Sequence, residues 1–195
     1  MSKGEATRQA VLDRAVEVAR QVGLSGLTIG RLAEQAQMSK SGLFAHFRSK
    51  EALQVAVLEH ARAGFEAHVA RPALTAPRGE ARLRSLFDHW LRWVSLPGGC
   101  PFVAAATEFD DQPGPVRDRV VHDLRDLFDM ISTVFRTGIT EGQFRADADP
   151  DQFAQDFYGV ILGYHYVRRV LGDDRAEQRA RRALDALIDQ ARRPA

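Results

Sequence analysis

The sequence predicts an all-α protein in which a small N-terminal helical unit precedes a larger helical bundle. Apolar residues recur at spacings of three and four along most of the chain. Breaks rich in Gly and Pro separate these stretches, and no stretch shows the alternation and β-branched enrichment that a strand requires. We therefore expect a first unit at residues 1–48 and a second at 49–195, beginning with a connecting helix at 49–71.

The composition favours a soluble protein without a cofactor. The chain has 195 residues, of which 45% are hydrophobic and 27% charged. It has no apolar run of about 20 residues and no apolar stretch near Met1, so we expect a cytoplasmic protein that does not bind membranes. Its single cysteine, Cys100, excludes a disulfide framework or a multi-thiolate zinc site. No metal-ligand spacing or Gly-rich phosphate loop is present, so we expect no cofactor.

The N-terminal quarter of the chain is basic. Residues 1–50 contain eight Lys or Arg and four Asp or Glu, whereas the net charge of the whole chain is only +1. A basic end on an otherwise slightly acidic chain is typical of a protein that meets a polyanion there. An ordinary solvated surface would account for the excess equally well.

The N-terminal unit is expected to contain short helices with recognisable caps. An apolar stripe runs over residues 7–21 and ends near Gly23, a residue suited to a helix C-terminus. Thr28 is placed to cap a short helix ending at Ala36, and Ser39 is placed to cap a helix over 40–47. Ser49 is then expected to begin a long helix to about residue 69, ended by Pro72.

The remainder of the chain predicts five further helices after a linker at 72–79. The breaks between them contain Gly, Pro and Asp in short clusters. The expected helices cover about 80–95, 101–109, 115–141, 150–171 and 175–192.

The helix at 40–47 carries few side chains of any size on its outward face. Leu43 and Phe47 fall on one side of a helical wheel, and Ser41 and Ala45, with Gly42 beside them, fall on the other. Two short helices joined by a tight turn form a helix-turn-helix, and a bare face lets the second helix enter a DNA major groove. A plain three-helix packing unit would show the same pattern, so DNA binding stays one of two interpretations at this point.

The stretch LTIGRLAEQAQMSKSGLFAHFRSKEAL, residues 27–53, resembles the DNA-binding segment of the tetracycline-repressor family of bacterial regulators. The similarity runs from Thr7 to about Leu58. It implies a DNA-binding domain of three helices followed by an all-helical domain for ligand binding and dimerisation. The residues expected to face double-stranded operator DNA are Thr28, Arg31, Ser39, Lys40, Ser41, Gly42, Phe44, Ala45, His46 and Lys50.

Two positions depart from the family pattern. Gln37 stands in the turn where the family often has Gly, and it is strained there if the turn needs a positive φ. Phe44 stands where Tyr is most frequent, so a hydroxyl able to bond a phosphate is missing.

The two last helices are the expected homodimer interface. Gly159 and Gly163 are one turn apart and permit close approach of another backbone. Packing of the same residues inside one subunit is the alternative. The residues assigned to the interface are Phe153, Gly159, Leu162, Gly163, Tyr166, Leu184, Leu187 and Ile188.

Aromatic residues are frequent in the middle of the chain. Aromatic side chains with a few polar groups suit a pocket for a small, largely apolar effector, although aromatics at helical spacing also form ordinary cores. Cys100, which precedes a proline at a helix start, is either a redox-sensitive thiol or a buried small residue. The residues assigned to the pocket are Trp90, Trp93, Phe102, Glu108, Phe109, Phe128, Phe135 and Tyr164.

The function expected from these features is that of a homodimeric, ligand-responsive transcriptional regulator, with a repressor released from its operator by its effector as the favoured form. The first alternative is a small-molecule binding protein that does not bind a specific operator. An enzyme is not expected, because no nucleophile is accompanied by a local signature for its base and orienting group.

Overall fold

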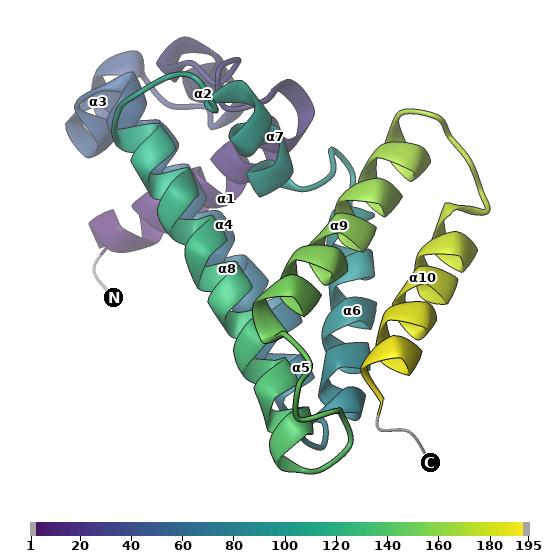
Figure 1. The fold of residues 1–195 in the computed structure, drawn as a ribbon. Coiled ribbons are helices and arrows are strands. Elements are labelled where there is room, and N and C mark those ends of the chain that lie inside the picture. The colour runs from purple at the N-terminus through teal and green to yellow at the C-terminus, as the bar shows by residue number, and fades with distance from the viewer. Residues whose placement is uncertain (1–2, 193–195) are drawn as a thin grey trace. The chain divides into compact units, whose positions relative to one another are not determined.

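The computed structural model describes residues 3–192, and all regular structure in this range is helical (Figure 1). The chain forms two compact units, one of residues 1–64 with 96–123 and one of 65–95 with 124–195. No helix in the described range is long and apolar enough to span a membrane. In chain order the helices are α1 (Lys3–Val22), α2 (Ile29–Gln35), α3 (Lys40–Phe47), α4 (Lys50–Phe65), a π-helical turn (Glu66–Ala70), α5 (Arg71–Leu74), α6 (Glu80–Val94), α7 (Pro101–Glu108), α8 (Pro115–Thr140), α9 (Pro150–Arg169) and α10 (Ala176–Ala191).

The fold therefore confirms the all-α prediction. The first unit contains more than the predicted 1–48, because α4, α7 and the first turns of α8 belong to it. Whether residues 1–48 fold as a domain of their own stays a prediction.

The short helices α2 and α3 begin at the predicted caps. Thr28 Oγ1 accepts a hydrogen bond from Arg31 N at 3.1 Å, and Ser39 Oγ accepts one from Gly42 N at 3.1 Å. Each cap satisfies an amide that the helix itself leaves free. Because helices of seven and eight residues are marginal alone, their stability comes from packing on α1 and on each other.

Gln37, between α2 and α3, has a positive φ, which is the condition under which the sequence analysis expected strain there. Its φ is 53°, and the amide of the next residue, Met38, reaches back to Ala33 O at 3.0 Å. This six-to-one hydrogen bond closes the end of α2 in the manner of a Schellman motif, where glycine is the preferred residue.

Replacing Gln37 with glycine is therefore expected to stabilise the protein by about 1 kcal/mol, because glycine adopts this φ without crowding its own Cβ. The matched control is Gln35→Gly, two residues earlier and inside α2, which is expected to cost about 1 kcal/mol. Urea unfolding of both variants measures the two free energies. Equal destabilisation by both changes would contradict a strained turn.

The long helix predicted to end before Pro72 continues past it. After α4 the chain widens into a π turn, in which Arg71 N donates to Glu66 O, five residues back. Pro72 then lies in the first turn of α5, where its missing N–H leaves no hydrogen bond unmade. The prediction of a stop was wrong because it considered only a continuous α-helix, and the linker shortens to residues 75–79.

In the second unit, α6, α9, α10 and the second half of α8 enclose an aromatic core. Phe135 stacks on Phe153 and Phe144, with ring centroids 4.2 and 4.6 Å apart. Phe87 meets Phe157 edge to face at 5.6 Å, and all five rings are buried. Such contacts add to the area burial that holds the bundle together.

Ion pairs join α6 to α10 along their exposed sides. Glu80 accepts from Arg84 at 2.8 Å and from Arg192 at 2.7 Å, and Arg84 also pairs with Asp185 at 2.6 Å. The hydrogen bond from Arg192 is the main cause that lowers the pKa of Glu80 below its ordinary value, with Arg84 adding to it and partial burial opposing it.

This lowered pKa predicts an acid-sensitive contribution to stability. Glu80 stabilises the folded state above the pKa of the unfolded chain, and the contribution is lost as the pH falls below 4.5 and through the folded value. Because the side chains of Arg192 and Glu80 are 46% and 24% exposed, solvent screens the pair, and the effect is expected to stay below about 1 kcal/mol. Unfolding free energies measured between about pH 6 and 3 should fall less steeply for Glu80→Gln and for Arg192→Met than for the parent. Parallel slopes for all three proteins would contradict this.

Candidate DNA-binding surface

Helix α3 is anchored by one face and leaves the opposite face bare. Leu43 and Phe47 are buried, at 0% and 3% exposure, and pack into the core of the first unit. On the other side, Ser41 and Ala45 are exposed. The exposed face therefore consists of small side chains, which lets the backbone of α3 approach the floor of a major groove.

Two larger exposed residues lie at the margins of this face. Phe44 is 51% exposed, so much of its ring faces solvent at the margin of this surface. Lys40 lies at the first position of α3, and a Cβ added to Gly30 would be 3.5 Å from its Cε and 3.8 Å from its Nζ. The stem of Lys40 thus crosses the start of α2, with its ammonium group at the edge of the surface.

Three of the predicted contacts also make hydrogen bonds within the chain. The Oγ atoms of Ser39 and Ser41 lie 3.1 Å apart, so both hydroxyls are at the start of α3. Lys50 Nζ donates to Ser25 O at 2.8 Å. All three side chains are exposed, so each can exchange its partner within the chain for a phosphate oxygen.

The remaining predicted contacts differ in exposure. Thr28 and Arg31 are exposed, and Arg31 Nη1 lies 3.5 Å from Gly26 O. His46 and Gly42 are half-buried, so they have less surface to offer. A further cation, Arg8 of α1, lies over the Phe47 ring at 5.4 Å and stabilises the base of α3 rather than extending from it.

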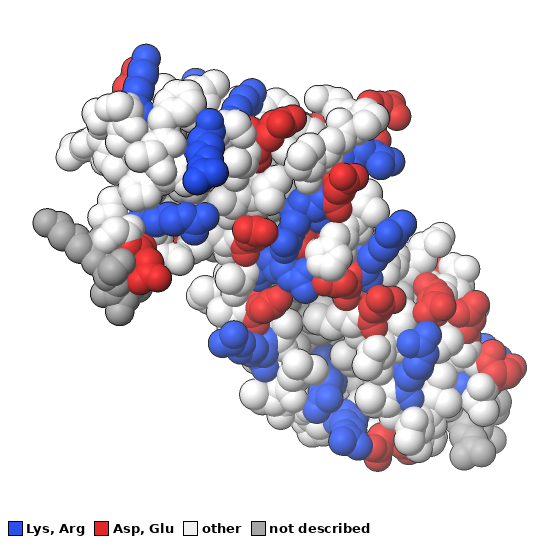
Figure 2. Space-filling view, turned by 90° about the vertical axis from the view of Figure 1, so that its left-hand side faces the viewer, with Lys and Arg blue, Asp and Glu red and all other residues white. Residues whose placement is uncertain are grey.

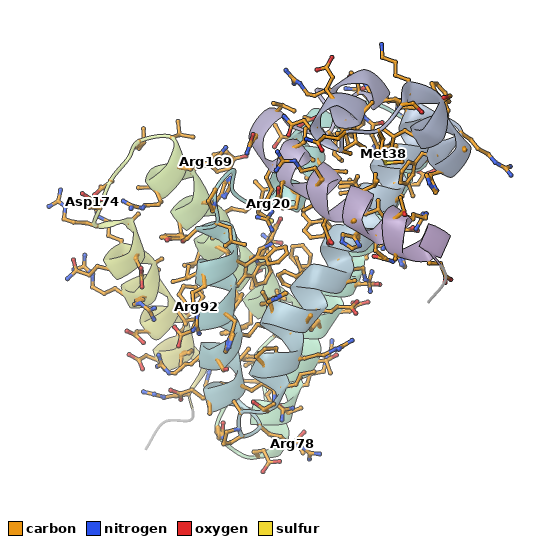
Figure 3. All side chains as sticks on the ribbon, turned by 180° about the vertical axis from the view of Figure 1, so that it is seen from behind. Arg20, Met38, Arg78, Arg92, Arg169 and Asp174 are labelled. Atoms are coloured by element: carbon orange, nitrogen blue, oxygen red, sulfur yellow. The ribbon has the colours of Figure 1, made fainter. Side chains whose placement is uncertain are left out.

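The charges on this unit are scattered. On the face that Figure 2 shows, Lys and Arg side chains in the upper part, which the N-terminal unit occupies, are separated from one another by uncharged residues and some acidic ones. Met38 is labelled in Figure 3, in the turn between α2 and α3. A surface with few separated cations makes few phosphate contacts, so recognition there depends on the shape of α3 as well as on charge.

Comparison with known proteins agrees with this geometry. The family model described as "Bacterial regulatory proteins, tetR family" matches residues 11–57. The model described as "Tetracyclin repressor-like, C-terminal domain" matches residues 79–184, more than half of the chain. The chain belongs to the tetracycline-repressor family.

The similarity to individual relatives extends over most of the chain. The HTH-type transcriptional repressor NemR of Escherichia coli K12 is 26% identical over 169 residues, covering 84% of each protein. The HTH-type transcriptional regulator SrpR of Pseudomonas putida is 26% identical over 167 residues, covering 85% of this chain and 76% of SrpR. The crystal structure of a TetR transcriptional regulator from Chloroflexus aurantiacus J-10-FL matches all of both chains with a TM-score of 0.90 and 27% identity.

The residues assigned to the effector pocket are divided between the two units of this family member. Phe102, Glu108 and Phe109 belong to the first unit, and the other five belong to the second. The Glu108 carboxylate accepts hydrogen bonds from the amides of Leu24 and Ser25, so both of its oxygens are bound to the backbone of the first unit.

Within the second unit, the predicted pocket residues differ in burial. Phe135 is fully buried in its aromatic stack, and the Tyr164 hydroxyl lies 2.7 Å from Ser95 Oγ. Both Phe135 and Tyr164 are therefore part of the packed core of the second unit. Trp90 and Trp93 meet Phe65 edge to face at 5.2 and 5.8 Å, and half-buried Phe128 meets Tyr158 at 5.3 Å. Lining of a pocket by any of these residues stays a prediction.

The residues assigned to the dimer interface fall into two groups. Phe153, Leu184 and Ile188 are buried within the subunit, at 6%, 3% and 0% exposure, so they offer no surface to a partner. Gly159, Gly163 and Tyr166 are exposed, and Leu162 and Leu187 are half-buried. The exposed and half-buried residues of the second group therefore stay the predicted dimer interface.

The sequence analysis did not identify several buried polar residues, among them Gln54, Arg20 and His165. Gln54 donates to Leu24 O, and Arg20 donates to Gly99 O. Burial lowers the pKa of the Arg20 guanidinium, while the neighbouring Cys100 raises it. Burial and Arg169 both lower the pKa of His165, which favours its neutral form. A polar residue inside an apolar stripe is a weak signal in sequence, because its partner lies far along the chain.

Proposed function

We propose that the protein is a homodimeric regulator that binds operator DNA through α3 and acts in the cytoplasm without catalysis, as a repressor released by a small, largely apolar effector. The observation that carries the DNA-binding role is the bare outward face of α3 beside its buried Leu43 and Phe47. A repressor is favoured over an activator because the relative NemR is named a repressor.

Exposed apolar residues at and just beyond the C-terminal end of α9 support the homodimer. Tyr166, Val170 and Leu171 are 44%, 70% and 73% exposed, at the end of the helix that carries Gly159 and Gly163. A Cβ added to either glycine would meet no atom within 4 Å. The exposed side chains thus supply apolar area, and the two glycines leave room for a second helix to approach closely.

We expect the double change Tyr166→Asp with Val170→Asp to convert the dimer to monomers, because an unpaired carboxylate buried in an interface is strongly unfavourable. Sedimentation velocity at micromolar concentration measures the mass. Thr133→Asp, an exposed position on α8, is the control and should remain dimeric. A dimeric double variant would show that the chains meet elsewhere.

The aromatic cluster of the second unit supports an apolar effector. We define this cluster as Phe65, Trp90, Trp93, Phe128 and Tyr158, in which the ring centroid of each residue lies within 6 Å of at least one other. The π turn at Glu66–Ala70 follows Phe65 directly, and such turns are frequent at functional sites. Effector binding would regulate the protein only if the effector has unequal affinity for the DNA-binding and the released state.

The experiment that tests the proposal is selection of binding sites from random duplex DNA, followed by gel shifts at two salt concentrations. A specific band that survives competitor DNA and weakens with salt is expected. Enrichment of no sequence would favour the alternative, a small-molecule binding protein without a specific operator. Release of the band by small apolar compounds would then identify the effector class.

A further inference from the structure

The turn between α1 and α2 is held by side chains from two other helices. Glu108, at the end of α7, accepts from Leu24 N at 3.2 Å and from Ser25 N at 2.6 Å. From α4, Gln54 Nε2 donates to Leu24 O at 2.7 Å and Lys50 Nζ donates to Ser25 O at 2.8 Å. We call these five residues the α1–α2 socket. Both amides and both carbonyls of its two turn residues are thus bound by side chains.

The socket is closely fitted around Glu108. Gly23 has a φ of 75°, and a Cβ added there would collide with the Glu108 carboxylate. Gln54 is only 3% exposed, although its side chain is polar. A buried amide side chain and a glycine that leaves room for a carboxylate both indicate a defined geometry rather than chance surface contacts.

Helix α7 is attached to α1 at its other end as well. Arg20, labelled in Figure 3 and 9% exposed, donates to Gly99 O just before α7 begins. A Cβ on Gly98 would lie 2.5 Å from Arg20 Cβ, so this turn also packs directly on α1. With both ends fixed, α7 holds the Glu108 carboxylate in register with the amides at the end of α1.

We propose that Glu108 is a positioning residue for operator binding, which sets where α2 begins and thereby how α3 is presented. Hydrogen bonds from amides to a carboxylate are stronger than those between neutral groups, so the carboxylate favours one conformation of the turn. Without it the turn samples other conformations, and apparent affinity falls with the fraction of molecules that present α3 correctly. This inference rests on the proposed DNA binding.

The test uses the sign of the effect on DNA affinity. Glu108→Gln removes a negative charge, so electrostatics alone predicts tighter binding to DNA. Loss of positioning predicts weaker binding. The NH₂ group of glutamine cannot accept a hydrogen bond, so one of the two backbone amides would lose its acceptor. We expect operator affinity about tenfold weaker, with the salt dependence unchanged because no phosphate contact is lost.

The matched control is Glu17→Gln on α1, which makes the same charge change at an exposed side chain paired with Arg14. This control is expected to bind the operator as tightly as the parent or slightly more tightly. Unchanged or tighter binding by Glu108→Gln would overturn the positioning role. A weakening of equal size in the control would overturn it too.

Hydrogen exchange provides a readout that does not need DNA. The amides of Leu24 and Ser25 are expected to exchange at least about tenfold faster in Glu108→Gln, with α3 amides less affected. Unchanged exchange at these two amides would overturn the socket even if the protein binds no operator. If Glu108→Gln fails to fold, Glu108→Asp keeps the charge but shortens the reach, and the same two measurements apply.

Discussion

Replacing Ser41 with glutamate is expected to abolish specific operator binding while the protein stays folded and dimeric. Ser41 is exposed at the second position of α3. A carboxylate there would face base-edge acceptors and phosphates, with which it makes no favourable contact. Because an acidic residue near a helix N-terminus interacts favourably with the helix dipole, the change should not weaken α3 itself. The affinity is expected to fall by at least about 100-fold.

The control for this variant adds the same charge elsewhere on the first unit. Gln21→Glu lies on the exposed side of α1 near its C-terminus. It should reduce affinity only slightly, because exposed charges are screened over about 10 Å at moderate salt. Fluorescence anisotropy with the selected operator measures the affinities of both variants, and circular dichroism checks that they are folded. If Ser41→Glu bound the operator as tightly as the parent, α3 would not be the helix that contacts the bases.

Replacing Asp123 with alanine is expected to cost about 3 kcal/mol of stability. Its side chain is 7% exposed and accepts from Arg62 at 2.9 Å and from Arg119 at 2.9 and 3.0 Å, which joins α4 to α8 in the first unit. Without the carboxylate, two guanidinium groups with 30% and 19% side-chain exposure face each other without their shared partner. Breaking a buried ion pair from one side is costly for this reason.

The control is Asp129→Ala, the same change at an exposed position of α8, which should alter stability by less than about 0.5 kcal/mol. Chemical denaturation of the two variants gives both values. A second check is the combined replacement of Arg62 and Arg119 by Met with Asp123 by Leu, which should recover much of the loss because no charge stays buried. Equal stability of the two alanine variants would contradict a structural role for the cluster.

Local chemistry made the helix-turn-helix predictable. Thr28 and Ser39 cap α2 and α3 as their residue types indicated, and Gln37 has the positive φ that its place in the turn required. The inward orientation of Leu43 and Phe47 follows from helical spacing alone. These features depend on interactions within three or four residues, which a sequence displays directly.

Other features depended on neighbours distant in sequence. The sequence predicted a pocket role for Glu108 and did not predict its hydrogen bonds to Leu24 and Ser25, which lie more than 80 residues away. Leu184 and Ile188 were assigned to an interface, but they fill the core of their own subunit. An apolar stripe specifies that a face is buried without specifying against which surface, so the subunit core and the dimer interface look alike in sequence.

The sequence by itself thus determined the helical class, the boundaries of α2 and α3, and the bare face of α3, because helical periodicity and capping act over single turns. Only the tertiary structure decided that the helix passes Pro72 through a π turn, that Asp123 joins α4 to α8, and that Glu108 holds the turn before α2. These depend on which helices pack side by side, and packing brings together residues whose spacing along the chain carries no signal of their contact.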